Sequence, residues 1–170
     1  MKIHSVLWIV PAIGILMSIG CTSSHSDSND SPSNTSPAAG TEVTILPNGE
    51  PSMVTVQHCL IGFEGSVAGK TVRRKQSDAE QLAKDLLKLL EAGDDFDEII
   101  HQYTDDSPPG IYTMTNSGVP IPPGSDAMSR DGMVKAFGDI GFKLQVGEFG
   151  LAPYDPATSK FGWHIIKRIK

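Results

Sequence analysis

The fold is decided by the last ten residues of the chain, Phe161-Gly162-Trp163-His164-Ile165-Ile166-Lys167-Arg168-Ile169-Lys170. This stretch is rich in aromatic and β-branched residues and contains no proline, which predicts a strand. The alternation of a strand places His164 and Ile166 on one face, and Trp163 and Ile165 on the other. Because both faces are apolar, we expect this strand to lie in the centre of its sheet.

A second strand of the same character is predicted in residues 53–62. His58 falls on one face among aliphatic residues, and Cys59 falls on the other. Each of the two predicted strands therefore carries one histidine. If the two histidine-bearing faces coincide, His58 and His164 approach each other across the sheet, where one ring can donate a hydrogen bond and the other can accept it.

Length and composition limit the classes of protein to which the chain can belong. Its 170 residues, 39% of them hydrophobic, allow one domain of ordinary size plus appendages. The net charge of −6 argues against nucleic acid as a partner, because proteins that bind phosphate backbones normally present a basic face. The two cysteines, Cys21 and Cys59, predict no disulfide framework. The histidines show no metal-ligand spacing, and we expect neither a metal nor a cofactor.

The N-terminus has the pattern of a targeting segment. Residues 6–19 form a continuous apolar run, which is shorter than the roughly 20 residues needed to cross a bilayer. The run leads into Met17-Ser18-Ile19-Gly20-Cys21, which resembles the bacterial lipobox. Residues 1–20 are therefore predicted to be a signal peptide, and Cys21 to be lipidated, which would anchor the protein to a membrane outside the cytoplasm. The alternative is an ordinary secretory signal that leaves Cys21 as a free thiol.

The rest of the chain divides by composition into a tether, a lead-in and a domain. Apart from Cys21 and His25, residues 21–41 are Ser, Asn, Asp, Thr, Pro, Ala and Gly with no large apolar side chain, which predicts a disordered tether. Residues 42–52 form a lead-in segment that can add a short strand. Residues 53–170 contain all the strongly patterned stretches and are predicted to form one folded domain.

Helices and strands follow one another in this domain. Ser77-Asp78-Ala79-Glu80 has the spacing of a capping box and predicts a helix that ends before Gly93. A second helix, capped by Asp94 or Asp95, is predicted over residues 96–103. Then follow a strand at 111–115, a short helix within 132–144 and a strand at 147–153 that forms a hairpin with the terminal strand. The order β-α-α-β-α-β-β predicts an α+β fold, a four-stranded, mostly antiparallel sheet flanked by three to four helices.

From residue 54 to the end, the chain resembles the parvulin family of peptidyl-prolyl cis/trans isomerases. Each matching motif is short, but the motifs occur in the family's order and near its spacing. They are Val56-Gln57-His58-Cys59-Leu60-Ile61, Ala92-Gly93-Asp94-Asp95-Phe96-Asp97 leading to Gln102-Tyr103-Thr104-Asp105-Asp106, Met133-Val134-Lys135-Ala136-Phe137, Val146-Gly147-Glu148 and Phe161-Gly162-Trp163-His164-Ile165-Ile166.

The resemblance implies roles for five side chains. His58 and His164 match the family's two histidines on adjacent central strands, and Asp106 matches a position that holds cysteine or aspartate. Met133 and Phe137 match the apolar floor that receives the proline ring of the substrate. Without the resemblance, histidines on an apolar strand face and apolar residues spaced as Met133 and Phe137 are more often ordinary core residues, and Asp106 is compatible with a turn or helix cap.

The chain also departs from the family pattern. Pro109-Gly110-Ile111-Tyr112-Thr113 replaces the family's Gly-Gly-Asp-Leu-Gly motif, so either Tyr112 or Met114 is expected to close the proline pocket. Phe161 stands where many members have a small polar residue. Arg73 and Arg74 lie in a basic loop that borders the site in parvulins, and they are expected to favour an acidic residue before proline; a solvated loop without this role is the alternative.

The resemblance implies a peptidyl-prolyl cis/trans isomerase that acts on proline-containing peptides or unfolded envelope proteins. We expect it to be a monomer that binds no nucleic acid and is attached to the membrane by its lipid anchor. The competing interpretation is a parvulin-fold chaperone or peptide-binding scaffold without catalysis. The altered glycine motif is the feature that keeps this second interpretation open.

Overall fold

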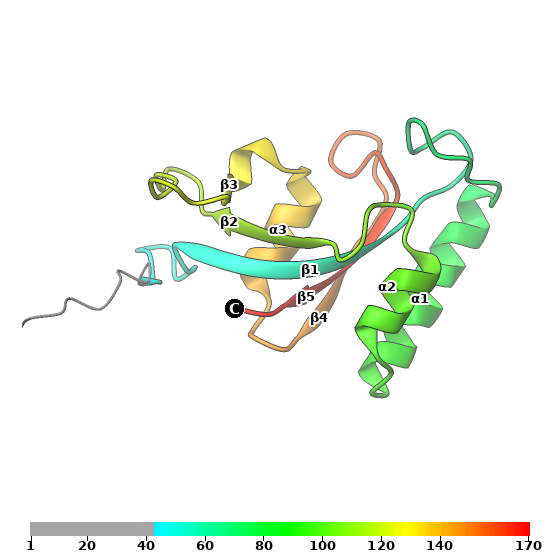
Figure 1. Ribbon diagram of the computed structural model, residues 1–170, viewed down its shortest axis with the longest axis horizontal. Helices are drawn as coiled ribbons and strands as arrows, with labels where there is room; N and C mark the ends of the chain where they lie inside the picture. Colours follow the sequence, from blue (N-terminus) through cyan, green and yellow to red (C-terminus); the bar gives the residue numbers. More distant parts are fainter. Residues whose placement is uncertain (1–42) are drawn as a thin grey trace, which may run out of the picture. The chain divides into compact units, whose positions relative to one another are not determined.

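A computed structural model describes residues 43–170 of the protein (Figure 1). The predicted signal peptide, the lipidation site Cys21 and the tether lie outside the described residues. The elements are, in order, β1 (Met53–Ile61), α1 (Gln76–Glu91), α2 (Phe96–Tyr103), β2 (Ile111–Thr115), β3 (Met128–Ser129), the 3-10 turn η1 (Arg130–Gly132), α3 (Lys135–Lys143), β4 (Phe149–Ala152) and β5 (Trp163–Arg168). None of the helices in this part of the chain is long and apolar enough to cross a membrane.

The strands form one sheet in the order β3-β2-β1-β5-β4, with β1 and β5 next to each other near its centre. All pairs are antiparallel except β2 with β3. The predicted α+β class is therefore confirmed, as is the β4–β5 hairpin. The predicted strand count of four was wrong, because β3 adds a fifth strand within a segment rich in proline and glycine. That strand pairs through only two residues, too few to produce an alternating pattern in the sequence.

The two faces of the sheet bury different cores. Cys59, Ile61, Trp163 and Ile165 face α1 and α2, and together they form one apolar cluster. The opposite face packs against α3 and contributes a second set: Val54, Val56, Met114, Ala152 and Ile166, with Phe137 and Phe142 from the helix. Figure 1 shows α1 and α2 on one side of the sheet and α3 on the other. Both histidines share the α3 side, as the alternation predicted.

Two helix ends show how local sequence sets the boundaries. Helix α2 begins as predicted, because the Asp95 carboxylate accepts hydrogen bonds from the backbone N–H groups of Asp97 (2.8 Å) and Glu98 (3.1 Å). The capping box predicted at Ser77 was wrong. Helix α1 begins at Gln76 with Lys75 as its N-cap and no side-chain cap, and the Ser77 hydroxyl instead contacts its neighbour Asp78.

The lead-in segment is tied to the domain by a partly buried ionic cluster. It folds back on itself through a bridge between Ile45 and Pro51. Nη1 of Arg130 lies 2.7 Å from Oε2 of Glu50, and Nη2 lies 2.9 Å from Oδ1 of Asp139 on α3. The guanidinium also packs 4.8 Å from the ring centroid of Phe142. Arg130 therefore links the lead-in, the segment after β3 and the helix that covers the sheet.

We expect Arg130→Met to lower the free energy of unfolding by about 2 kcal/mol, because it leaves two partly buried carboxylates without their shared cation. Urea unfolding measures this change. Lys84→Met is the matched control, since the pair of Lys84 with Glu80 is about half exposed and such pairs contribute about 0.5 kcal/mol or less. Equal losses in the two variants would show that the cluster has no structural role beyond that of a surface ion pair.

Candidate active site

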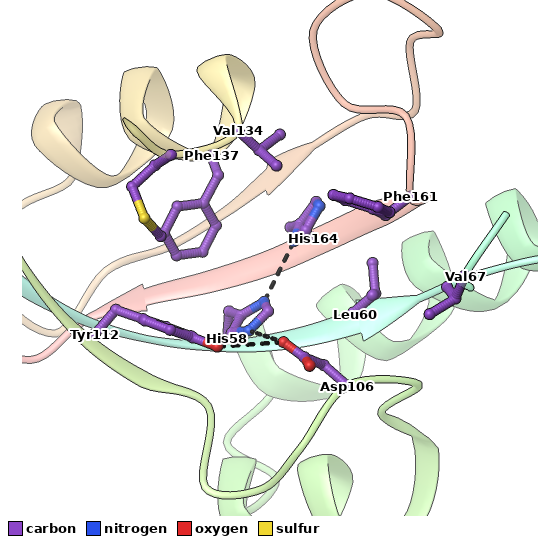
Figure 2. A pocket seen from close by; sticks show the side chains of 10 residues that line it. His58, Leu60, Val67, Asp106, Tyr112, Val134, Phe137, Phe161 and His164 are labelled. Carbon is purple, nitrogen blue, oxygen red and sulfur yellow. Dashed lines mark hydrogen bonds and ion pairs between the residues drawn. The ribbon is translucent and has the colours of Figure 1, made fainter. Parts of the chain in front are cut away.

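A cavity of about 230 Å³ opens on the α3 side of the sheet, near the C-terminal end of β1 and the N-terminal end of β5 (Figure 2). Binding sites for drug-sized ligands are roughly 300–1,000 Å³, so this cavity has the size for a single side chain rather than for a larger ligand. We call it the central cavity. Its lining residues are His58, Leu60, Val67, Asp106, Tyr112, Met133, Val134, Phe137, Phe161 and His164.

One wall of the central cavity is apolar and comes from the start of α3. Met133 ends the η1 turn and Val134 is the N-cap of α3, so the helix begins directly over the cavity. Phe137 follows one turn later and is almost fully buried. Its ring meets those of His58 and His164 edge to face, with centroids 5.2 and 5.6 Å away. These contacts hold the aromatic wall in one position against the sheet.

The opposite wall carries a chain of polar groups. Nε2 of His58 lies 3.1 Å from Oδ2 of Asp106, and Nδ1 of His58 lies 3.3 Å from Nδ1 of His164. The Tyr112 hydroxyl donates to the same Asp106 oxygen over 3.4 Å. Figure 2 shows His58 in the middle of this chain. The predicted approach of the two histidines is present in the structure, because His164 lies opposite Leu60 and thus diagonal to His58.

The charge of Asp106 determines the direction of these hydrogen bonds. The hydrogen bond from His58 lowers the pKa of Asp106 to about 2, so the carboxylate is ionised at neutral pH and can only accept. His58 must then donate from Nε2. In the neutral ring its Nδ1 is an acceptor, and His164 donates to it from Nδ1. The tautomers of both rings are thus set by Asp106.

His164 is neutral in this arrangement. The ring is 4% exposed, and its burial, followed by the charge of His58, lowers its pKa to about 3. With the proton on Nδ1, its Nε2 keeps a free lone pair, and this atom is buried without a partner among the described residues. The site therefore has an ionised Asp106 at the outer end of the polar chain and a neutral His164 at its buried end.

Residues 44–169, which contain every element around this cavity, match the family of PPIC-type PPIase domains. The chain belongs to this parvulin family.

Relatives of this parvulin include larger proteins. Over 88 residues it is 35% identical to foldase protein PrsA 4 of Bacillus cereus, and the match covers 52% of this chain and 27% of the relative. Over 113 residues it is 31% identical to chaperone SurA of Chromohalobacter salexigens, with 66% and 21% covered. The chain thus spans about a quarter of the length of these relatives. Peptidyl-prolyl isomerase ESS1 from Candida albicans has the same fold, with a TM-score of 0.50, 22% identity and coverage of 72% and 69%.

The loop after α2 brings Asp106 to the parvulin site. The segment runs along β1 before β2 begins: the N–H of Asp105 donates to the Leu60 carbonyl (2.8 Å), and the N–H of His58 donates to the Gly110 carbonyl (2.9 Å). Gly110 has φ +66°, and a Cβ there would lie 2.4 Å from the carbonyl oxygen of His58. The altered glycine motif therefore still supplies a glycine where the chain passes closest to β1.

Six of the predicted site residues line the central cavity, and three do not. The six are His58, Asp106, Tyr112, Met133, Phe137 and His164. Of the two candidates for closing the parvulin pocket, Tyr112 lines the cavity, whereas Met114 is fully buried beneath α3. Arg74 does not line the cavity either, and its guanidinium binds the Asp105 carboxylate and the Gly62 carbonyl. Arg73 is exposed and lies outside the cavity lining.

Four lining residues were absent from the sequence-based set: Leu60, Val67, Val134 and Phe161. Leu60 and Val134 lie within two residues of the predicted site residues His58 and Met133. Their closeness to these residues in the sequence was the signal that could have identified them. Val67 belongs to a polar loop without periodicity, and its only signal was an isolated apolar side chain there. Phe161 stands at the start of the predicted terminal strand, but β5 begins two residues later and leaves Phe161 in the preceding turn. Within residues 43–170, no group of His, Cys, Asp and Glu side chains is arranged to hold a metal ion.

Proposed function

We propose that this protein is a peptidyl-prolyl cis/trans isomerase that acts on Xaa-Pro bonds of proteins outside the cytoplasm. The observation that carries the proposal is the central cavity, in which an apolar wall sized for one ring faces an ordered polar chain. The apolar side chains Met133, Val134 and Phe137 hold the proline ring. Asp106 and the two histidines set the polarity around the amide that rotates.

The chemistry requires no covalent step. Rotation about a prolyl amide breaks its resonance, and the barrier is roughly 18–20 kcal/mol. Resonance makes the planar amide more polar than the twisted amide, and water therefore stabilises the planar amide more. A cavity that removes water from the amide favours the twisted state by comparison. An ionised Asp106 near the carbonyl oxygen acts in the same direction, because it repels the more negative oxygen of the planar amide. Cys59 is no candidate nucleophile: it faces the opposite core, and burial raises its pKa to about 12.

A protease-coupled assay on a short Ala-Pro peptide tests the proposal, with residues 43–170 as the protein because they contain the whole sheet and the helices that cover it. We expect the cis peptide to be consumed faster than its uncatalysed rate, which corresponds to tens to hundreds of seconds. The second candidate is a chaperone or scaffold that binds peptides without catalysis, and the names foldase and chaperone carried by the relatives support it. An unchanged rate, together with suppressed aggregation of an unfolded protein, would select this second function.

We further propose that Cys21 carries a lipid that anchors the protein outside the cytoplasm. The support is in the sequence alone, a short apolar run that ends at a glycine and a cysteine. Metabolic labelling with a fatty acid is expected to mark the wild-type protein and not Cys21→Ser. Label that persists in the variant would contradict the anchor.

A further inference from the structure

The loop that carries Asp106 is held to β1 by backbone hydrogen bonds at both ends. At its start, the Asp105 N–H donates to the Leu60 carbonyl (2.8 Å), and at its end the Gly110 carbonyl accepts from the N–H of His58 (2.9 Å). Between these points the loop contains two prolines, which have no N–H group to donate to a strand. The backbone thus anchors the loop at its ends and leaves its middle to side chains.

One buried side chain, that of Gln57, joins this loop to helix α2. Its Nε2 donates to the Pro109 carbonyl (3.1 Å) and to Oδ1 of Asp97 (2.6 Å) in the first turn of α2. A side-chain amide nitrogen carries two N–H groups and both partners are acceptors, so these two bonds fix the orientation of the amide. Gln57 is 8% exposed, and water therefore competes little for them.

The two partners of Gln57 lie at opposite ends of one segment. Asp97 lies at the start of α2, Pro109 lies near the end of the loop, and Asp106 lies between them. Helix α2 is itself fixed, because Ile99 and Ile100 are buried in the core against the sheet. Gln57 thus ties the loop that carries Asp106 to a helix that cannot shift freely.

Gln57 and His58 are neighbours in the chain but lie on opposite faces of the sheet. Gln57 contacts α2, whereas His58 lines the central cavity on the α3 side. The Gln57 side chain does not line that cavity. Its influence on the site therefore runs through the loop to Asp106, whose Oδ2 lies 3.1 Å from Nε2 of His58.

We propose that Gln57 is a positioning residue of the site, and that its hydrogen bonds to Asp97 and Pro109 keep Asp106 within reach of His58. The proposal deepens the function proposed above and rests on it. Asp106 sets the tautomers of both histidines, so a displaced loop disturbs the polar wall of the cavity. The apolar wall comes from the start of α3 and does not depend on this loop. Loss of the Gln57 amide therefore lowers kcat and leaves KM unchanged, because the proline ring is still held.

The test replaces Gln57 with methionine, which has a similar length and no donor. We expect kcat for a short Ala-Pro peptide to fall about tenfold with KM unchanged, since a catalytic group misplaced by about 1 Å can cost up to about 100-fold. Thr55→Val is the matched control. It removes a hydrogen bond from the same face of β1, that of Thr55 with Thr113 (3.0 Å), and should leave both constants unchanged.

A second pair of variants separates the hydrogen bond from the charge. Asp97→Asn and Asp97→Ala both remove the same negative charge from the first turn of α2, and only asparagine keeps an oxygen that can accept from Gln57. We expect kcat to fall less in Asp97→Asn than in Asp97→Ala, and equal losses would reject the hydrogen bond as the cause. Asp97 is exposed, so this comparison remains decisive if Gln57→Met is too unstable to assay.

A readout that does not require catalysis separates positioning from a purely structural role. The NMR shifts of the ring nitrogens of His58 report which nitrogen carries the proton, and the wild type should carry it on Nε2, as the bond to Asp106 requires. At pH 7.5 we expect Gln57→Met to change these shifts and Thr55→Val to keep them.

The outcomes distinguish this proposal from the proposed function. Ring shifts that are identical in Gln57→Met and the wild type would overturn the role of Gln57, and so would a loss of kcat no greater than that in Thr55→Val. Both results leave the isomerase standing. If the wild type accelerates no peptide, the isomerase proposal fails, and the ring shifts alone then decide whether Gln57 positions Asp106.

Discussion

Gly110→Ala is expected to abolish activity and to lower the free energy of unfolding by roughly 3 kcal/mol. Two costs add. The residue has φ +66°, a region that costs an L-amino acid about 1–2 kcal/mol, and the new Cβ would lie 2.4 Å from the His58 carbonyl oxygen. That oxygen belongs to a central strand and cannot move freely, so the loop must shift instead. Because the same loop carries Asp106, its displacement breaks the hydrogen bond to His58.

Gly118→Ala is the matched control for this prediction. Gly118 has φ +75°, close to the value at Gly110, but a Cβ there meets nothing within 4 Å. It should therefore cost only about 1–2 kcal/mol and leave activity intact. Urea unfolding and the peptide assay on both variants give the comparison. Equal effects would mean that the approach of Gly110 to β1 has no special importance for the site.

The stability of the protein is expected to fall steeply in acid because of His164. Its pKa is about 3 in the folded chain and about 6.5 in a free imidazole, so below pH 6.5 the unfolded chain binds a proton that the folded chain does not. This contribution is complete above pH 6.5 and is lost as the pH falls towards 3, at about 1.4 kcal/mol per pH unit. Asp106, with its pKa lowered to about 2, acts in the same direction below pH 4.

Urea unfolding of the wild type and of His164→Gln at pH 7.5, 6 and 4.5 measures this effect. The variant should be less stable at pH 7.5, because His58 loses a partner, and should lose less stability on acidification. His101→Gln, at an exposed position of α2, is the control. Identical pH slopes in the wild type and His164→Gln would contradict the assignment of a neutral, buried imidazole.

Activity should follow a different pH profile from that of a proton-transfer enzyme. Neither histidine exchanges a proton with the substrate when an amide rotates, so activity is expected to be nearly constant around neutral pH. It should decline only in acid, where stability is also lost. A bell-shaped profile centred near neutrality would indicate direct acid–base chemistry by His58 or His164 and would overturn the mechanism proposed here.

The central strand pair was predictable because alternation alone decides which face a strand residue occupies. The approach of His58 and His164 required only that β1 and β5 be neighbours with their histidine-bearing faces together. Asp106 could be assigned only through the family resemblance, because its position depends on backbone hydrogen bonds between a loop and β1. Hydrogen bonds of this kind leave no periodic pattern in the sequence.

The errors in prediction also have physical causes. The capping box at Ser77 follows a local rule, but the Ser77 hydroxyl binds Asp78 and Glu80 pairs with Lys84, so neither side chain caps the helix. The carbonyl of Lys75 already accepts from the N–H of Ala79, and the helix begins before the serine. Phe161 lines the central cavity, and the sequence around it does not predict this position. The position depends on the hydrogen bond from the Ser66 hydroxyl to the Phe161 carbonyl, which joins two loops that are far apart in the sequence.

The central claim is that the central cavity holds the proline ring while its amide rotates. Exchange NMR on a proline peptide tests it directly, because uncatalysed cis/trans interconversion is too slow to give cross-peaks at mixing times of about one second. Val134→Trp fills the cavity from a half-buried position at the start of α3. We predict cis/trans cross-peaks with a catalytic amount of wild type and none with folded Val134→Trp. Cross-peaks absent with the wild type, or equally strong with the variant, would contradict the claim.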